Sequence, residues 1–278
     1  MSARRSAAAP IGVFDSGVGG LTVLRELCRE LPDEDFIYLG DTARLPYGTK
    51  SAHSVARYAV QAGEALDALG IKALVVACNT ASALGLAAVR AQLEGLLVIG
   101  VLEPGAHAAC AASDSGAIAL IATEATVRGG AYTRAILQRR AAARVAAVAC
   151  PLFVALAEEG LCEGPIALAV ARHYLQPLFT GGAAADTLLL GCTHFPPLAA
   201  TFREVLGTGV TIVDSAATTA LALRSQLRAA HLLRAPHEPR AGGSLRFLAT
   251  DGVERFARVG SQFLGRPILA GEVELVDL

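Results

Sequence analysis

Two cysteines, Cys78 and Cys192, lie in matching sequence contexts far apart in the chain. Each follows an apolar run that ends in a small residue, residues 73–77 before Cys78 and residues 187–191 before Cys192. Such a run is typical of a buried parallel strand, and the residues after it lie at the carboxyl end of the sheet, where open α/β sheets bind ligands. The pattern predicts two thiols that face one ligand from opposite sides.

Polar residues directly follow both thiols: Asn79 and Thr80 follow the first, and Thr193 and His194 follow the second. The alternative is that both cysteines pack as small hydrophobic residues, which is the commoner role of a lone cysteine. An amide, hydroxyls and an imidazole in these places favour the reactive interpretation.

The composition indicates a soluble protein of one large domain or two domains of ordinary size. The 278 residues carry a formal net charge of −1, so neither nucleic acid nor an anionic membrane surface is an expected partner. The longest apolar stretch, residues 145–157, contains Pro151 and is shorter than the roughly 20 residues of a membrane span. The segment MSARRSAAAP is basic but lacks the apolar core of a signal peptide. We therefore expect a cytoplasmic protein.

The cysteines argue against a metal site, and the lysines are poor candidates for holding pyridoxal phosphate but do not exclude it. The six cysteines are dispersed without a CxxC pair, which in a cytosolic chain argues against a disulfide framework and a zinc site. A pyridoxal-phosphate enzyme needs a Schiff-base lysine. The only lysines are Lys50, in a turn-like segment, and Lys72, just before an apolar run, and neither position suits that role.

Short apolar runs alternate with longer helical patterns along the chain, which indicates βαβ units and mostly parallel sheets. The predicted strands are residues 11–14, 36–39, 73–77, 97–101, 117–122, 144–149, 187–191, 211–213, 245–249 and 272–276. The predicted helices are about residues 21–31, 51–69, 80–94, 125–140, 164–178, 196–206, 215–232 and 251–264. Residues 235–243, with their prolines and glycines, are predicted to form an exposed loop.

Each half of the chain contains one of the two cysteines with its preceding apolar run. This division favours an α/β fold of two domains that face each other across an active-site cleft. Residues 100–105 and 214–215 are the expected crossings between the domains. The first domain is then discontinuous, residues 1–100 plus 214–278 with Cys78, and the second domain is residues 101–213 with Cys192.

A glycine-rich turn follows the first predicted strand at Asp15 and Ser16. Its glycines permit a close backbone approach before a helix whose N-terminus favours anions, although the two side chains can also simply cap that helix. The turn alone is a weak nucleotide signal. A second loop ends in Gly-Thr-Lys-Ser at residues 48–51, but it lacks the contiguous Gly-Lys-Ser/Thr of a phosphate loop, so that interpretation is rejected.

Taken together, these segments resemble the motifs of the glutamate racemases. The resemblance is carried by residues 14–23, 41–48, 77–82 and 191–196, with further agreement at 150–154 and 214–215. It runs from about Ile11 to Phe263 and implies two pseudo-symmetric α/β domains with the active site between them. It also implies a cofactor-independent enzyme that supplies D-glutamate for bacterial peptidoglycan. Because the chain before Ile11 is short, regulation by a cell-wall precursor, as in some members, is not expected.

Inversion of a carbon centre needs proton removal on one face and proton delivery on the other, so two acid/base groups are required. Cys78 and Cys192 are predicted to be these groups. Each must be activated, because a free thiol is only a few per cent ionised at neutral pH. His194 can polarise Cys192, and the resemblance places Asp15 on the Cys78 side.

Glutamate is the expected substrate, and a homodimer is left open. The side chains expected to bind its charged ends follow the strands: Asp15, Ser16, Asn79, Thr80, Thr193 and His194. Backbone groups of Tyr47 and Gly48 resemble a clamp for the second carboxylate.

Other titratable residues are weaker candidates. Helical patterns predict surface or core positions for Tyr58, His53, His107 and His173, and packing positions are predicted for Cys28, Cys110, Cys150 and Cys162. The family has an acidic neighbour of the catalytic histidine near Glu158 and Glu159, although a solvated helix face explains this pair equally well. Ala125 stands where the family usually has glycine, which predicts an altered turn near the substrate side chain.

Three rival functions differ from this prediction in what they require. A racemase of aspartate or another amino acid would use the same chemistry. A catalytically silent amino-acid-binding module would keep Asn79, Thr80 and Thr193 but would not need both thiols. A thiol-redox protein would have its cysteines close in sequence.

Overall fold

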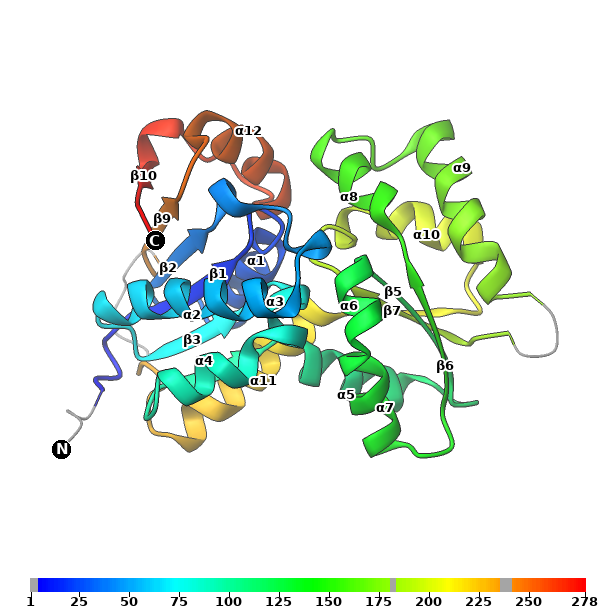
Figure 1. The fold of residues 1–278 in the computed structure, drawn as a ribbon, viewed down its shortest axis with the longest axis horizontal. Helices are drawn as coiled ribbons and strands as arrows, with labels where there is room; N and C mark the ends of the chain where they lie inside the picture. The colour runs from blue at the N-terminus through cyan, green and yellow to red at the C-terminus, as the bar shows by residue number, and fades with distance from the viewer. Residues whose placement is uncertain (1–4, 181–183, 236–241) are drawn as a thin grey trace.

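The computed structural model describes residues 5–180, 184–235 and 242–278, and its strands form two parallel sheets. Sheet A has the strand order β10-β9-β2-β1-β3-β4, and sheet B has the order β6-β5-β7-β8. Figure 1 shows two lobes, with sheet A on the left and sheet B on the right. The predicted α/β fold of two domains with parallel sheets is confirmed.

The strand bounds are as follows. Sheet A consists of β1 (Ile11–Asp15), β2 (Phe36–Gly40), β3 (Ala73–Val76), β4 (Leu97–Gly100), β9 (Leu245–Ala249) and β10 (Val273–Leu275). Sheet B consists of β5 (Ala117–Ala122), β6 (Arg144–Ala149), β7 (Thr187–Gly191) and β8 (Thr211–Asp214).

Helices surround both sheets. In chain order they are α1 (Leu21–Glu30), α2 (Ala52–Ala68), α3 (Asn79–Leu84), α4 (Leu86–Gln92), α5 (Leu102–Ala112), α6 (Glu124–Gly129), α7 (Ala131–Arg139), α8 (Pro151–Glu158), α9 (Gly164–Leu175), α10 (Ala199–Leu206), α11 (Ser215–Ala229) and α12 (Val253–Leu264). Short 3₁₀ segments occupy Thr42–Arg44, Tyr47–Thr49, Gln176–Leu178, Pro196–Leu198 and Ala270–Glu272.

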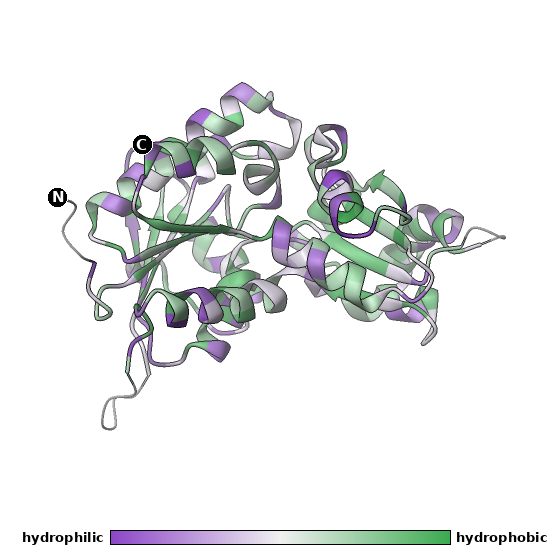
Figure 2. Ribbon diagram, turned by 90° about the horizontal axis from the view of Figure 1, so that it is seen from below, coloured by the Kyte–Doolittle hydropathy of each residue, from purple (hydrophilic) through white to green (hydrophobic). Residues whose placement is uncertain are grey.

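Alternate strand side chains enter separate cores on the two faces of sheet A. Val13 and Val75 pack in the core that α1 and α12 share, whereas Phe14 and Val76 pack in the core of α2 and α4. Because both faces are covered, the central strands β1, β2 and β3 are buried along their whole length and appear in the sequence as mostly apolar runs. Figure 2 shows the hydrophobic strands, with most hydrophilic residues on the surrounding helices and loops.

The chain passes between the sheets twice. After β4 it enters α5, which packs against β7 and β8 of sheet B. After β8 it enters α11, which packs against α1 beside sheet A. The remaining segment adds β9, α12 and β10 to sheet A, as the orange and red ribbon in Figure 1 shows.

A buried ion pair lies at the amino edge of sheet A, the edge opposite the cysteines. Lys72 is fully buried and Glu34 nearly so, and the Lys72 ammonium donates to the Glu34 carboxylate and to the carbonyl of Ala7. Arg234 places a second cation 3.8 Å from the same carboxylate. A buried ammonium needs such partners, so Lys72 has a structural role.

The structure differs from the predicted elements mainly in its helices. Two predicted helices are each divided at a glycine, one at Gly85 and the other at Gly130, whose φ is 63°. Helices α5 and α8 were not predicted. Helix α8 begins with Pro151, whose fixed φ suits the first turn of a helix. Most of the predicted loop 235–243 lies outside the described residues.

Candidate active site

The polar residues predicted from the sequence gather where β1, β3 and β7 end. In sheet A, Phe14 is in register with Val76, so Asp15 and Cys78 leave the sheet at the same edge. Cys78 then caps α3, because its Sγ accepts a hydrogen bond from the backbone N–H of Ala81 at 3.4 Å.

Cys78 lies in a buried, anionic environment. Its Sγ is 3.5 Å from the hydroxyl of Ser16, and its residue is 5% exposed. Burial and the negative charge of Asp15 raise the pKa of the Cys78 thiol to about 12, and charge on Cys192 acts in the same direction. Cys78 is therefore a neutral thiol at neutral pH.

Asp15 is fully buried at the end of β1, and its two oxygens differ. Oδ2 accepts from the backbone N–H of Gly17 at 2.9 Å, whereas Oδ1 has no hydrogen-bond partner among the described residues. Burial raises the pKa of this carboxyl, although the charge on His194 and nearby backbone N–H groups oppose the rise. A buried acceptor without a partner is costly, so this oxygen is suited to a ligand donor.

Cys192 has a cationic neighbour instead. Its Sγ lies 4.0 Å from Nδ1 of His194, and Nε2 of His194 lies 3.0 Å from Oε1 of Glu158. Burial lowers the pKa of His194, but hydrogen bonds with Cys192 and Glu158 and the charges of Cys192 and Asp15 outweigh it and raise the value to about 10. The imidazole is thus protonated at neutral pH and lies beside the Cys192 sulfur.

Glu158 is the acidic residue that reaches the histidine, and the exposed Glu159 does not replace it. Its pKa is lowered by the hydrogen bond from His194, and its second oxygen accepts from Arg255 at 2.7 Å. Sequence reasoning did not identify Arg255, nor Phe263, whose ring packs edge-on against His194 at 5.1 Å. Both lie on α12, and an ordinary amphipathic helix gives no signal of such contacts.

Asn79 is 2% exposed and has one free functional group. Its Oδ1 accepts a hydrogen bond from the Tyr132 hydroxyl, whereas Nδ2 has no partner in the described parts of the chain. A buried amide donor in this state fits the oxygen of a ligand carboxylate.

Three threonine hydroxyls form a compact cluster beside Asn79. Oγ1 of Thr80 lies 2.9 Å from that of Thr123 and 3.1 Å from that of Thr126. Thr123 also packs under Gly48, where an added Cβ would lie 2.8 Å from the Thr123 Cβ. The cluster therefore links the Tyr47–Thr49 turn to the start of α6.

Ala125 lies in the first turn of α6 and is 1% exposed. The side chain of Thr123 caps this helix by accepting from the backbone N–H of Thr126. The predicted altered turn is thus a helix start in this chain, where alanine is a favourable residue.

The edges of the two sheets meet at the β1–α1 loop. The Thr22 hydroxyl donates to the carbonyl of Thr193 at 3.1 Å. A Cβ added to Gly19 would lie 2.4 Å from Oγ1 of Thr193 and 2.5 Å from Nδ1 of His194. Only glycine permits this approach, which brings the loop of sheet A against the Cys192 side.

The weaker candidates lie elsewhere. His53, His107 and His173 are exposed, and Tyr58 packs against Tyr47 and the Arg44 guanidinium. Cys150 is buried, and Cys28, Cys110 and Cys162 are half-buried. Among the described residues, no helix is long and apolar enough to cross a bilayer, and no group of three or more His, Cys, Asp or Glu residues could hold a metal ion.

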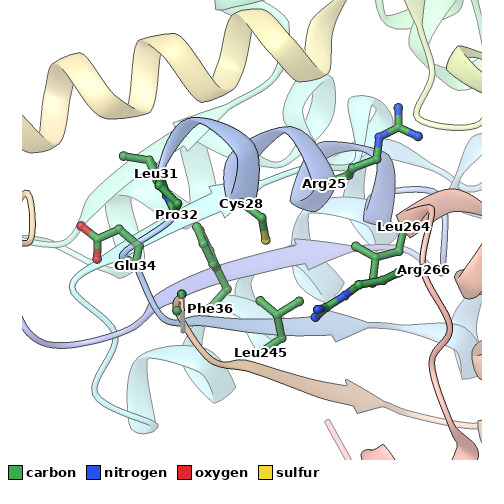
Figure 3. A pocket seen from close by; sticks show the side chains of 11 residues that line it. Arg25, Cys28, Leu31, Pro32, Glu34, Phe36, Leu245, Leu264 and Arg266 are labelled. Atoms are coloured by element: carbon green, nitrogen blue, oxygen red, sulfur yellow. The ribbon is translucent and has the colours of Figure 1, made fainter. Parts of the chain in front are cut away.

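A cavity of about 310 Å³ lies at the other end of sheet A. Phe36 and Leu245, the first residues of β2 and β9, form part of its wall, with Cys28 pointing in and Arg266 across it, as Figure 3 shows. These two residues begin their strands, whereas the cysteines follow the ends of theirs, which is where parallel sheets bind ligands. This cavity is therefore separate from the site of the two cysteines.

The chain is similar to known amino-acid racemases. A family model described as Asp/Glu/Hydantoin racemase matches residues 11–223. Glutamate racemase from Geobacter metallireducens is 47% identical over 268 residues, which cover 96% of each chain. The crystal structure of a glutamate racemase from Bacillus anthracis has a TM-score of 0.89 and 38% identity, covering 97% of this chain and 98% of that one. Glutamate racemase from Francisella tularensis in complex with D-glutamate has a TM-score of 0.88 and 35% identity, covering 98% of both chains. The chain therefore belongs to the Asp/Glu/hydantoin racemase family and is an isomerase.

Proposed function

We propose that this isomerase interconverts L- and D-glutamate without a cofactor, by proton transfer at Cα between Cys78 and Cys192. The observation that carries the proposal is the pair of thiols at matching strand ends of two sheets, in opposite electrostatic surroundings. In this proposal Cys192, beside the His194 imidazolium, acts as the base, and the neutral Cys78 thiol beside Asp15 acts as the acid. In the reverse direction the two sulfurs exchange roles.

The free polar atoms support an amino acid as the substrate. Nδ2 of Asn79 would donate to the α-carboxylate, and Oδ1 of Asp15 would accept from the ammonium group or from the Cys78 thiol. Ser16, Thr80 and Thr193 supply hydroxyls at the same strand ends. In this proposal the backbone of Tyr47 and Gly48 binds the side-chain carboxylate.

The domain assignment and the biological role belong to the same proposal. Residues 1–100 plus 214–278 form one domain and residues 101–213 form the other, with the substrate in the cleft between them. The relatives named glutamate racemase support D-glutamate as the product. A cytoplasmic enzyme with this product would supply peptidoglycan synthesis.

The test is proton NMR of L-glutamate in heavy water with protein dialysed against a chelator and given no pyridoxal phosphate. The Cα proton signal should disappear as solvent deuterium enters, and chiral chromatography should show D-glutamate. L-aspartate in a parallel sample tests the rival substrate. Exchange of aspartate but not glutamate, or a requirement for either cofactor, would contradict the proposal.

Alanine variants test the roles of the thiols. Cys78→Ala and Cys192→Ala should each retain less than about a tenth of the wild-type kcat, a barrier increase of more than ~1.4 kcal/mol. Cys110→Ala is the matched control, because Cys110 is half-buried beside α7 and its thiol donates to the carbonyl of Ile136, away from the strand ends of the site. Normal kcat in either active-site variant would rule out a two-thiol mechanism.

A further inference from the structure

Arg255 and Glu158 form an ion pair that joins the two sheets' domains beside the active site. Arg255 lies in α12, which follows β9 of sheet A, and Glu158 ends α8, which follows β6 of sheet B. Nη2 of Arg255 lies 2.7 Å from Oε2 of Glu158. The pair therefore exists only while the two domains hold their present relative position.

Both carboxylate oxygens of Glu158 are engaged, and on opposite sides. Oε2 accepts from Arg255, and Oε1 lies 3.0 Å from Nε2 of His194. Nδ1 of the same imidazole lies 4.0 Å from Sγ of Cys192. A continuous series of polar contacts thus runs from a surface guanidinium on one domain to the thiol on the other.

We propose that Arg255 is a positioning residue for the Cys192 side of the active site: its guanidinium fixes the Glu158 carboxylate against His194 when the two domains are together. The inference rests on the proposed function, because it assigns Cys192 and His194 to the proton transfer. It makes the Cys192 side of the active site dependent on the relative position of the two domains. Loss of the Arg255 contact leaves the carboxylate free to rotate towards solvent, which weakens its hydrogen bond with His194.

Helix α12 is suited to this role because it also contacts His194 directly. The ring of Phe263 packs edge-on against the imidazole, and Arg255 on the same helix binds the Glu158 carboxylate. The charged groups that act on His194 are Cys192, Glu158 and Asp15. Of these, Glu158 is the one whose orientation Arg255 fixes.

The effect should appear in catalysis more than in stability. The Arg255 side chain is 53% exposed and that of Glu158 is 20% exposed. Exposed ion pairs contribute little to folding, so the variants should remain folded. A guanidinium that binds one carboxylate oxygen still restricts the rotation of that carboxylate, and proton transfer depends strongly on orientation.

The experiment compares Arg255→Gln with Arg258→Gln on the same helix. Arg258 is exposed and has no ion pair or hydrogen bond with the described residues, so it controls for the loss of a surface charge. We expect Arg255→Gln to lower kcat about three- to fivefold, the size of one well-placed surface interaction. Arg258→Gln should match wild type, and Arg255→Lys should lie between wild type and Arg255→Gln.

The pKa of His194 provides a readout that a merely structural role would not change in the same way. Histidine NMR should show a lower pKa for His194 in Arg255→Gln, because the hydrogen bond that His194 donates to Glu158 is weakened. The alkaline limb of the kcat profile should move in the same direction. If Arg255 acted only as a nearby positive charge, its removal would raise this pKa, and that outcome would overturn the inference.

A double-mutant cycle with Glu158→Gln tests whether Arg255 acts through Glu158. In the Glu158→Gln background, Arg255→Gln should cause no further loss of kcat. Additive losses, or an Arg255→Gln variant identical to Arg258→Gln, would refute the role of Arg255 while leaving racemisation intact. A wild-type protein without racemase activity would instead refute the proposed function, and the His194 titration would still report on the Arg255 contact.

Discussion

The two thiols have the same chemical function but different electrostatic neighbours. Cys78 is beside the carboxyl of Asp15, whereas Cys192 is beside the imidazolium of His194. The surroundings of the two sulfurs thus differ in the sign of the nearest charge, although both sulfurs follow strand ends of the same kind.

Asn79→Asp tests the free amide at the scale of one atom. The new carboxylate keeps the acceptor for Tyr132 but replaces the Nδ2 donor with an oxygen that repels a substrate carboxylate. We expect KM for glutamate to rise at least about tenfold, the equivalent of ~1.4 kcal/mol, with the fold unchanged by circular dichroism. Tyr132→Phe is the control. An equal rise in KM in that variant would attribute the effect to the lost Tyr132 bond.

Glu158→Gln tests the His194 pair through the pH dependence of stability. The pKa of His194 is raised from its ordinary value near 6.5 to about 10 in the folded protein. Its stabilising contribution is therefore fully present below about pH 6.5 and is lost as the pH rises towards 10. Urea unfolding should show a wild-type advantage of about 1–3 kcal/mol at pH 6 that becomes smaller at pH 10. An advantage that does not change with pH would exclude this coupling.

Among the elements, the β1–α1 loop has the tightest fit to its surroundings. Gly19→Ala must displace Thr193 or His194, because the added Cβ would overlap both side chains. Overpacking of this kind costs about 1–3 kcal/mol, and here the displaced imidazole is next to Cys192. We expect kcat/KM to fall at least about tenfold.

Gly17→Ala is the control for this prediction. It lies in the same loop, and its added Cβ would be 3.6 Å from Leu45, an ordinary van der Waals distance. Its kcat/KM should remain within about twofold of wild type. Similar losses in both variants would mean that the loop responds to lost glycine flexibility and not to contact with His194.

Strands were easier to predict from the sequence than helices. Strands of a parallel sheet are mostly apolar, and residues 117–122, 144–149, 187–191 and 245–249 match the structure end for end. Helix α5 contains Pro104 and Gly105 in its first turns, which hide it in the sequence although proline is tolerated there. Gly85 and Gly130 divide helices that hydrophobic periodicity alone shows as continuous.

At the scale of the whole molecule, the candidate site depends on segments that are distant in the chain. Sequence motifs identified the residues at the strand ends, because motif and strand end coincide. They could not identify Phe263, which packs against His194, or Arg255, which binds Glu158 beside it. Both residues lie on α12, which returns to sheet A after the chain has formed sheet B.

Ligand protection tests whether the two thiols share one substrate. D-glutamate should slow iodoacetamide labelling of Cys78 and Cys192 together, since a molecule bound between the domains covers both and favours closure. Labelling of Cys110, half-buried beside α7, should not change. Site-resolved mass spectrometry measures all three. Protection of only one active-site thiol would mean that the two do not face a common ligand.

The return of the chain to sheet A has a consequence for synthesis on the ribosome. Sheet B is complete once β8 has emerged, but β2 keeps an unpaired edge until β9 is made, and such edges favour association with other chains. Helix α12 follows β9, so Arg255 and Phe263 are among the last residues to reach the site. A nascent chain therefore contains both cysteines and His194 well before it contains Arg255 and Phe263. A chain that ends after β8 would carry the sequence motifs of the site but lack these two α12 residues.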